Sequence, residues 1–165
     1  MTTSAYGLEP ITAYTDGACL GNPGPGGWGI VIRDSRAKRV ACGHSPDTTN
    51  NRMELQAVIE TLKAIRQTMR PLIIVTDSEY VSKGVTERLP RWKAGGWRTA
   101  SRKPVANQDL WQELDALLAS RAGPVEFRWV KGHSGHPGND EADALAYRGA
   151  HGETVNERTA LEVSA

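Results

Sequence analysis

The hydrophobic spacing changes from a strand period to a helix period near residue 49, and this change most constrains the fold. Before it, residues 11–16, 28–33 and 39–44 are apolar segments joined by short polar links, which is typical of an antiparallel meander. After it, apolar residues recur at spacings of three and four, which predicts an amphipathic helix. The residues of this stripe are Leu55, Val58, Ile59, Leu62 and Ile65. Such a helix is expected to cover one face of the sheet.

The second half of the chain alternates short strands with helices. Residues 72–76 are an unbroken apolar run, which is typical of a strand buried on both faces. Helices are predicted over residues 107–120 and 139–148, with a strand over residues 125–130 between them. This order predicts an α/β fold in which helices flank a five-stranded mixed sheet. Because crossovers between parallel strands are right-handed, the first and fourth strands are expected to be parallel neighbours.

Bulk properties set broad limits on the protein. We expect one domain over residues 1–150, followed by a flexible tail over residues 151–165 that lacks periodicity. The net charge of +1 implies no partner by itself, so nucleic-acid binding requires a local basic patch. No apolar run approaches the roughly 20 residues of a membrane span, and no signal peptide is evident. Cys19 and Cys42 fit a reducing, cytoplasmic location, although two cysteines can also form one bridge.

Two aspartates occupy matched positions in the predicted sheet. Asp16 and Asp77 each end an apolar strand, and parallel neighbours bring these ends to one edge. Carboxylates side by side repel each other, and a divalent cation such as Mg²⁺ relieves the repulsion. Glu54 borders the apolar stripe of the first long helix, and Asp143 lies in the last helix, so both are further candidates. For a single acid, a helix cap or a turn is the more common role, and spacing alone leaves both interpretations open.

The glycine-rich segment over residues 15–32 contains a literal G-x-G-x-x-G match from Gly24 to Gly29. A dinucleotide-binding loop requires these glycines to open a helix, with an acid about 20 residues further on. Here Gly29 opens an apolar strand, and prolines interrupt the loop. The glycines therefore favour a tight hairpin with positive φ angles that brings backbone close to a ligand.

Five motifs, in order, resemble type I ribonuclease H of the bacterial kind. They are YTDGACLGNPGPGGWG, TTNNRMELQAVIE, VTDSEYV, WKAGGWRTASRKPVANQDLWQELD and VKGHSGHPGNDEADALA, and the resemblance covers about residues 12–148. It implies the ribonuclease H-like fold, with strand order 3-2-1-4-5. It also implies an endonuclease that cuts the RNA strand of an RNA–DNA hybrid and leaves 5′-phosphate and 3′-hydroxyl ends.

The resemblance also implies the catalytic residues and the cofactor. It assigns four acids as both catalytic residues and metal ligands, namely Asp16, Glu54, Asp77 and Asp143. Two Mg²⁺ ions about 3.5–4 Å apart, for which Mn²⁺ can substitute, would serve an in-line displacement. His133 matches the family's loop histidine, which is expected to move a proton or to assist product release. A loop histidine among glycines often has no role, and His136 is expected to be structural.

Contacts with the hybrid are implied in two places. Residues 88–103, the basic segment, contain six basic residues and no acid, which attracts phosphates. The alternative is a solvated surface loop with tryptophans packed beneath it. The contacts expected in the basic segment are Trp92, Lys93, Trp97, Arg98 and Lys103. Those expected near the acids are Cys19, Asn22, Thr49, Asn50 and Asn51, of which at least one is also expected to cap the first long helix.

Three functions are weighed. A monomeric, hybrid-specific ribonuclease is the main hypothesis. A non-catalytic module that binds the hybrid is disfavoured by the four acids, because they repel phosphate. A related nuclease or strand-transfer domain is disfavoured because the single compact domain has no additional DNA-binding segments. Cleavage of a labelled hybrid with Mg²⁺ distinguishes these hypotheses.

Overall fold

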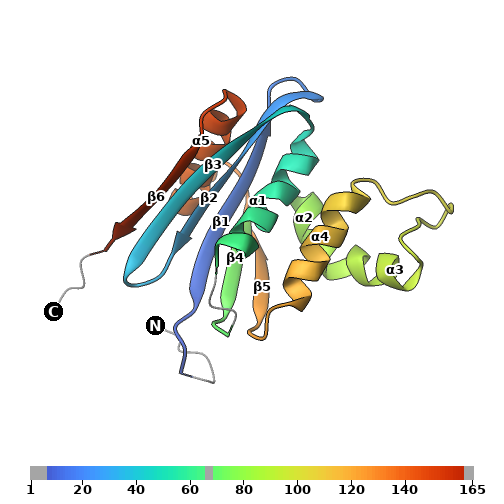
Figure 1. The fold of residues 1–165 in the computed structure, drawn as a ribbon, viewed down its shortest axis with the longest axis horizontal. Helices are drawn as coiled ribbons and strands as arrows, with labels where there is room; N and C mark the ends of the chain where they lie inside the picture. Colours follow the sequence, from blue (N-terminus) through green and yellow to red (C-terminus); the bar gives the residue numbers. More distant parts are fainter. Residues whose placement is uncertain (1–6, 66–68, 162–165) are drawn as a thin grey trace.

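The computed structural model describes residues 7–65 and 69–161, in which a twisted mixed sheet carries helices on both faces (Figure 1). The strands are β1 (Ile11–Cys19), β2 (Gly24–Arg33), β3 (Ala37–Thr48), β4 (Leu72–Thr76), β5 (Val125–Trp129) and β6 (Val155–Ala160). The helices are α1 (Asn50–Ala64), α2 (Glu79–Lys83), α3 (Leu89–Ala94), α4 (Gln108–Ala119) and α5 (Pro137–Ala150), with a π-helical turn over Gly84–Arg88. Helices α1, α2 and α4 pack on one face of the sheet, and α5 packs on the other.

The strand order in the sheet is β5-β4-β1-β2-β3-β6. β1 pairs antiparallel with β2 and parallel with β4, and β4 pairs parallel with β5. The predicted α/β class, the mixed sheet and the parallel pairing of the first and fourth strands are therefore confirmed. The expected order 3-2-1-4-5 is present within the observed order.

The sheet has six strands, so the prediction of five is corrected. β6 pairs antiparallel with β3, from Val155 opposite Cys42 to Ala160 opposite Ala37. It lies within the segment that we expected to be a flexible tail, and that expectation is corrected for residues 155–160. The strand is polar and mostly exposed, and only Val155 packs partly against the core. An edge strand of this kind depends on the free backbone groups of its neighbour, which a hydrophobic pattern does not reveal.

Two side-chain caps set where helices begin. Thr49 caps α1, because its Oγ1 accepts a hydrogen bond from the Arg52 backbone N–H at 3.3 Å. Ser78 caps α2, because its Oγ accepts from the Val81 backbone N–H at 3.1 Å. Thr49 is thus the capping residue among the expected candidates.

The larger core lies between the sheet and α1, α2 and α4. Trp111 of α4 is fully buried there, and its Nε1 donates a hydrogen bond to the Tyr80 hydroxyl at 2.9 Å. The ring of Trp92 lies edge-on to Trp111, with 5.2 Å between the ring centroids. This packing attaches α3, and therefore the basic segment, to the body of the domain.

The glycine-rich segment lies mostly within strands, and its glycines allow helices to approach the sheet closely. β2 begins at Gly24, so the expected positive φ is confined to Gly21, at 73°. A Cβ on Gly17 would collide with the backbone of α1, and a Cβ on Gly29 would collide with the backbone of α5. These contacts correct our expectation of a ligand-facing hairpin for most of the segment. They seat α1 and α5, and the acids on these helices, against the sheet.

Candidate active site

Parallel pairing of β1 with β4 brings two of the predicted acids to one edge of the sheet. Thr15 lies opposite Thr76 in the register, so Asp16 and Asp77 follow at matching positions. Ligand oxygens of Asp16, Asp77 and Glu54 all lie within 4.8 Å of one another. The structure therefore brings together Asp16 and Asp77, which are more than sixty residues apart in sequence, with Glu54 between them in the chain.

Glu54 reaches this cluster from α1. Its side chain is buried at 6% exposure, and that of Asp16 at 3%. Gly17 lies between them, and its backbone N–H donates a hydrogen bond to Asp16 Oδ1 at 3.0 Å. The absence of a side chain at Gly17 allows α1 to approach β1 closely enough for the two carboxylates to meet.

Asp143, the fourth predicted acid, lines the same cleft from α5 but lies outside the tight cluster of three. The cleft has a volume of about 340 Å³, and its other lining residues are Gly17, Asn50, Asn51, Ser78 and His133. A larger hollow of about 430 Å³ lies at the opposite end of β1, around Thr12. Within the described ranges it holds no comparable group of converging acids, so chemistry rather than size identifies the site.

Burial dominates the electrostatics of the cluster. It raises the pKa of Asp16 above its ordinary value, and the neighbouring carboxylates of Glu54 and Asp77 raise it further. Burial also raises the pKa of Glu54, against a hydrogen bond with Asp16 that lowers it. In residues 7–65 and 69–161, no lysine or arginine forms an ion pair with any of the four acids. Among the described residues, the buried Glu54 Oε2 also has no hydrogen-bond partner. Within these ranges, no cationic side chain therefore offsets the repulsion among the carboxylates.

This donor set fits a hard divalent cation. Mg²⁺ prefers oxygen ligands and retains several waters, and the cleft offers carboxylate oxygens together with an open polar lining. A cation would remove the repulsion between Asp16, Glu54 and Asp77, and it would give the unpartnered Glu54 oxygen a ligand role. The residues present therefore support dependence on a divalent metal.

The two histidines of the loop before α5 occupy different environments. His133 is exposed at the rim of the cleft, with a left-handed backbone at φ 53°. His136 is half-buried at the N-cap of α5, and its ring centroid lies 5.5 Å from that of Tyr14. His133 can therefore reach a molecule in the cleft, whereas His136 packs against the sheet.

The predicted contacts near the acids surround the start of α1. Asn50 and Asn51 are exposed and line the cleft. Asn22 Oδ1 accepts a hydrogen bond from the Asn50 backbone N–H at 3.0 Å, which ties the β1–β2 connection to α1. The Cys19 thiol turns toward backbone carbonyls of the same connection, with the shortest at 3.2 Å. Thr49 is engaged as the helix cap.

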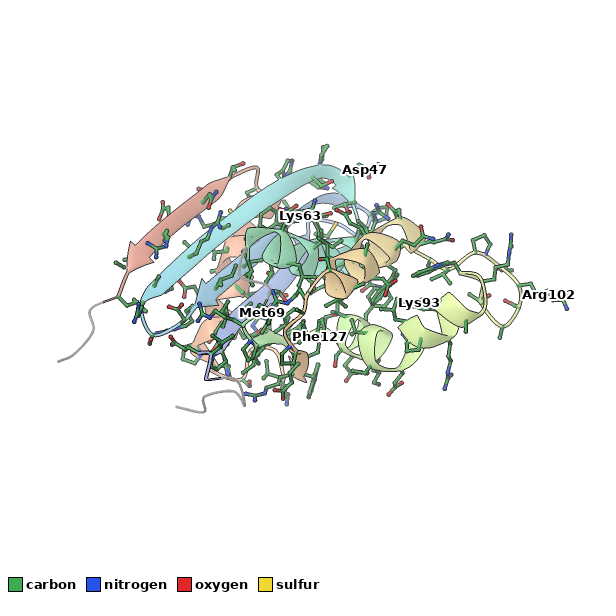
Figure 2. All side chains as sticks on the ribbon, turned by 60° about the horizontal axis from the view of Figure 1, so that its bottom comes forward. Asp47, Lys63, Met69, Lys93, Arg102 and Phe127 are labelled. Atoms are coloured by element: carbon green, nitrogen blue, oxygen red, sulfur yellow. The ribbon has the colours of Figure 1, made fainter. Side chains whose placement is uncertain are left out.

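The basic segment forms α3 and the loop that follows it. Figure 2 shows Arg102 at the outer end of this loop, away from the sheet, and Lys93 on α3. Arg98 and Lys103 are exposed, and Arg98 Nη1 donates a hydrogen bond to the Arg102 carbonyl at 3.0 Å. Lys93 pairs with Asp115 of α4 at 3.1 Å. The segment therefore presents cations on a projection that is fixed at its base.

Both tryptophans of the basic segment are half-buried. Trp92 and Trp97 pack against the larger core, and the Trp97 backbone N–H donates to the Trp92 carbonyl at 2.7 Å. Their placement matches the alternative that the sequence left open, in which tryptophans support a charged surface from beneath.

A polar network fastens the end of this loop to α1. Arg52 donates two hydrogen bonds to the Asp109 carboxylate, at 3.0 and 2.7 Å. Asn107 has a left-handed backbone at φ 59°, and its Nδ2 donates to the Tyr80 hydroxyl at 3.0 Å. The network connects α1, α2 and α4 directly behind the residues that line the cleft.

Asn139 is a residue of the site that the sequence analysis missed. Its side chain is 1% exposed, and its Nδ2 lies 3.5 Å from Asp77 Oδ2. It precedes Asp143 by four residues, which places both on one side of α5. This spacing was the signal available in the sequence, and burial next to Asp77 depends on tertiary packing.

The fold and the site together define a metal-dependent phosphodiester hydrolase. A cluster of carboxylates at the end of parallel strands suits the divalent cations that assist phosphoryl transfer. The family model for RNase H matches residues 9–151, and the chain belongs to the RNase H family. It is accordingly a hydrolase that acts as an endonuclease on an RNA strand.

Relatives named as ribonucleases H match most of the chain. "Ribonuclease H" of Verminephrobacter eiseniae is 56% identical over 144 residues, which is 86% of this chain and 91% of that protein. "Ribonuclease HI" of Pseudomonas aeruginosa is 55% identical over 141 residues, which is 86% of this chain and 93% of that protein. The range matched by the family model, residues 9–151, includes all four predicted acids.

Solved structures share the fold. LC9-RNase H1, described as a type 1 RNase H with the type 2 active-site motif, superposes with a TM-score of 0.77 and 34% identity. That similarity covers 91% of this chain and 78% of LC9-RNase H1. A foamy viral protease-reverse transcriptase in complex with RNA/DNA hybrid gives a TM-score of 0.67 and 28% identity. It covers 86% of this chain but only 20% of the viral protein.

Proposed function

We propose that this cleft hydrolyses the RNA strand of an RNA–DNA hybrid and leaves 5′-phosphate and 3′-hydroxyl ends. The proposal is carried by the convergence of Asp16, Glu54 and Asp77 in a cleft where no cationic side chain of the described ranges pairs with them. Such a cluster repels phosphate unless metal ions intervene, so a role in binding alone does not account for it. The hybrid held by the related foamy viral enzyme supports the choice of substrate.

The four acids would hold two Mg²⁺ ions, for which Mn²⁺ can substitute. When bound, the ions supply Lewis-acid stabilisation of the charge that develops on the phosphoryl group and its leaving oxygen. Asp16 is central, because its side chain interacts with those of Glu54, Asp77 and Asp143. Burial keeps Asp16 and Glu54 in fixed positions, so their side chains would need little rearrangement to hold the ions.

The hybrid would lie across the cleft and reach the basic segment. Asn50 and Asn51 line the cleft at the start of α1, where backbone N–H groups favour a phosphate. Asn22 and the Cys19 backbone would lie beside the RNA sugars, whose 2′-hydroxyls distinguish RNA from DNA. Thr49 supports these contacts as the cap of α1. The basic segment, with Trp92 and Trp97 beneath its cations, would hold the DNA strand through phosphate contacts.

The test is cleavage of an end-labelled RNA–DNA hybrid with Mg²⁺. We expect RNA-strand products with 5′-phosphate ends, no products in EDTA, and no cleavage of matched double-stranded DNA or RNA. Mn²⁺ added after EDTA treatment should restore activity. Failure to cleave the hybrid at any Mg²⁺ or Mn²⁺ concentration would refute the proposal, as would equal cleavage of double-stranded DNA.

Changing His133 to alanine is expected to slow turnover without abolishing it. The imidazole lies at the rim of the cleft and can transfer a proton, whereas the acids remain intact. We expect kcat to fall about 100-fold, at the lower end of the roughly 10²–10⁴-fold contribution of a proton-transfer group. Single-turnover and steady-state cleavage would be measured with His136→Ala as the comparison, for which little change in kcat is expected in folded protein. Complete loss of activity, or an unchanged kcat, would contradict the auxiliary role of His133.

Removing two cations of the basic segment is expected to weaken binding more than chemistry. In the Arg98→Ala/Lys103→Ala variant, KM for the hybrid should rise several-fold while kcat at saturating hybrid stays within about twofold. The slope of log Kd against the logarithm of the salt concentration should also fall by about 1.4–1.8, because each of the two lost phosphate contacts removes about 0.7–0.9 from this slope. Filter binding with catalytically inactive protein at several salt concentrations measures this slope.

The matched control removes the same charge elsewhere. Arg33 and Arg158 are exposed at the far end of the sheet from the acids. The Arg33→Ala/Arg158→Ala variant should leave the slope nearly unchanged. Equal slopes for the two double variants would show that the basic segment does not contact the hybrid.

We further propose that the enzyme acts as a monomer in the cytoplasm and that residues 1–150 form its catalytic domain. Both cysteines are free thiols, which suits a reducing compartment. In the described part of the chain, none of the helices combines the length and hydropathy required to cross a membrane. All four acids lie before residue 150.

A further inference from the structure

Asn139 is a fully buried polar side chain that the four-acid site does not explain. It lies in the first turn of α5 and is 1% exposed, deeper than Asp143 on the same side of the helix. Its Oδ1 is buried and has no hydrogen-bond partner among the described residues. A buried amide with an unused acceptor is costly to a fold, so its presence requires a compensating role.

The contact that Asn139 makes is with Asp77. Asn139 Nδ2 lies 3.5 Å from Asp77 Oδ2, so the amide donates toward the carboxylate. The opposite orientation of the amide would set its oxygen against the same carboxylate oxygen, which is repulsive. The orientation of Asn139 therefore follows from the negative charge of Asp77.

Asp77 is held from two further directions by the chain before α5. Trp129 Nε1 donates a hydrogen bond to the Asp77 backbone carbonyl at 2.9 Å. Gly132 lies directly against the carboxylate, because a Cβ there would come within 2.8 Å of Asp77 Oδ2. Asp77 is thus oriented by the last residue of β5 and by residues that follow it, whereas Asp16 and Glu54 are held by burial at the β1–α1 contact.

We propose that Asn139 is a positioning residue for the reaction, which orients Asp77 through its amide and so sets the affinity of the acid cluster for a divalent cation. The contact of the amide with Oδ2 would fix the rotation of the Asp77 carboxylate, one oxygen of which lies within 4.8 Å of ligand oxygens of Asp16 and Glu54. This inference rests on the proposed metal-binding role of the four acids. Outer residues that orient a ligand typically change metal affinity or activity by 10- to 100-fold when they are removed.

The experiment compares Asn139→Ala and Asn139→Leu with the wild type. Both variants remove the amide, and the leucine retains most of the side-chain volume and thereby limits cavity formation. Mg²⁺ binding is measured without substrate by isothermal titration calorimetry, and kcat and KM are measured over a range of Mg²⁺ concentrations. Thermal unfolding in EDTA reports on stability of the metal-free fold. Thr61→Val is the matched control, because Thr61 is also a fully buried polar residue, but its Oγ1 donates a hydrogen bond to the Ala57 carbonyl within α1 rather than to an acid of the site.

We expect both Asn139 variants to raise the Kd for Mg²⁺ by about 10- to 100-fold, with KM for the hybrid at saturating Mg²⁺ nearly unchanged. Higher Mg²⁺ should restore part of kcat. Thr61→Val should keep the wild-type Kd. A Kd within twofold of wild type in a folded Asn139 variant would overturn the proposal, whatever the change in kcat. Loss of the fold in both variants would also overturn it, because Asn139 would then act only in stability.

The two proposals fail in different ways. If the wild type binds Mg²⁺ but does not cleave a hybrid, the proposed substrate is wrong and the comparison of Kd values still tests Asn139. If the wild type cleaves the hybrid and the variants keep its Kd, only the role of Asn139 is wrong.

Discussion

The Asp16→Asn variant should keep the fold and lose nearly all cleavage of the hybrid. Asparagine retains the size of the side chain but removes the charge at the centre of the acid cluster. Metal ions contribute several kcal/mol to charge stabilisation in the transition state, so we expect kcat to fall by about 10³-fold or more. Cleavage at saturating Mg²⁺, with circular dichroism as the check on folding, measures the effect.

The same variant should be more stable than wild type when metal is absent. Burial raises the pKa of Asp16 in the folded state, so the folded protein favours the protonated carboxyl. The contribution of Asp16 to the stability of the metal-free wild type is therefore greatest below the ordinary carboxyl pKa and is lost as the pH rises toward the raised value. In Asp16→Asn this pH dependence should weaken, and the unfolding midpoint in EDTA at neutral pH should increase.

Asp47→Asn is the control for the loss of one negative charge. Asp47 is exposed near the end of β3 (Figure 2), and its replacement should change neither cleavage nor the pH dependence of stability. Wild-type cleavage by folded Asp16→Asn would remove Asp16 from the catalytic cluster.

The Gly29→Ala variant should lose about 3 kcal/mol of unfolding free energy, near the upper end of the usual cost of overpacking. The added methyl group would meet the backbone of α5 at Ala142 and Ala146, and backbone cannot move aside as a flexible side chain can. Because α5 carries both Asp143 and Asn139, its displacement should also lower the activity of the molecules that remain folded. Urea unfolding and hybrid cleavage measure the two effects.

Gly95→Ala provides the matched substitution at an exposed position with a less severe contact. Gly95 has φ −93°, and a Cβ there would lie no closer than 3.2 Å to another heavy atom. Its effect on stability should stay within about 0.5 kcal/mol, as for most surface changes. If Gly29→Ala were equally mild, the close packing of β2 on α5 would not be a source of stability.

The Asp16→Asn and Gly29→Ala variants separate two functions of the glycine-rich segment. Its acid, Asp16, faces the cleft, whereas Gly17 and Gly29 determine how closely α1 and α5 pack on the sheet. The G-x-G-x-x-G match from Gly24 to Gly29 therefore reflects close packing of helices on the sheet, not the binding of a dinucleotide. Helices that cross a sheet at backbone contact require positions without a Cβ, and several of these positions fall in one segment because β1 and β2 lie at the centre of the sheet.

Several features of the fold could be predicted because they depend on local chemistry. The apolar stripe from Leu55 to Ile65 and the cap at Thr49 follow from side-chain spacing and hydrogen bonding within one helix. The meeting of Asp16 and Asp77 followed from the handedness of crossovers, which makes β1 and β4 parallel neighbours. The strand β6 was missed because Val155–Ala160 is polar, and its pairing depends on the free edge of β3.

By itself, the sequence determined the order of strands and helices, the class of the sheet and which acids were available to a metal site. The period of the hydrophobic pattern, the helix caps and the strand ends each depend on a few neighbouring residues, so they can be recognised from the sequence. Only the tertiary structure decided that Trp92 and Trp97 pack inward, that Asn139 is buried against Asp77 and that Gly17 admits Glu54 to the cluster. These outcomes depend on distances between segments that are remote in sequence, and close packing of the completed core sets those distances.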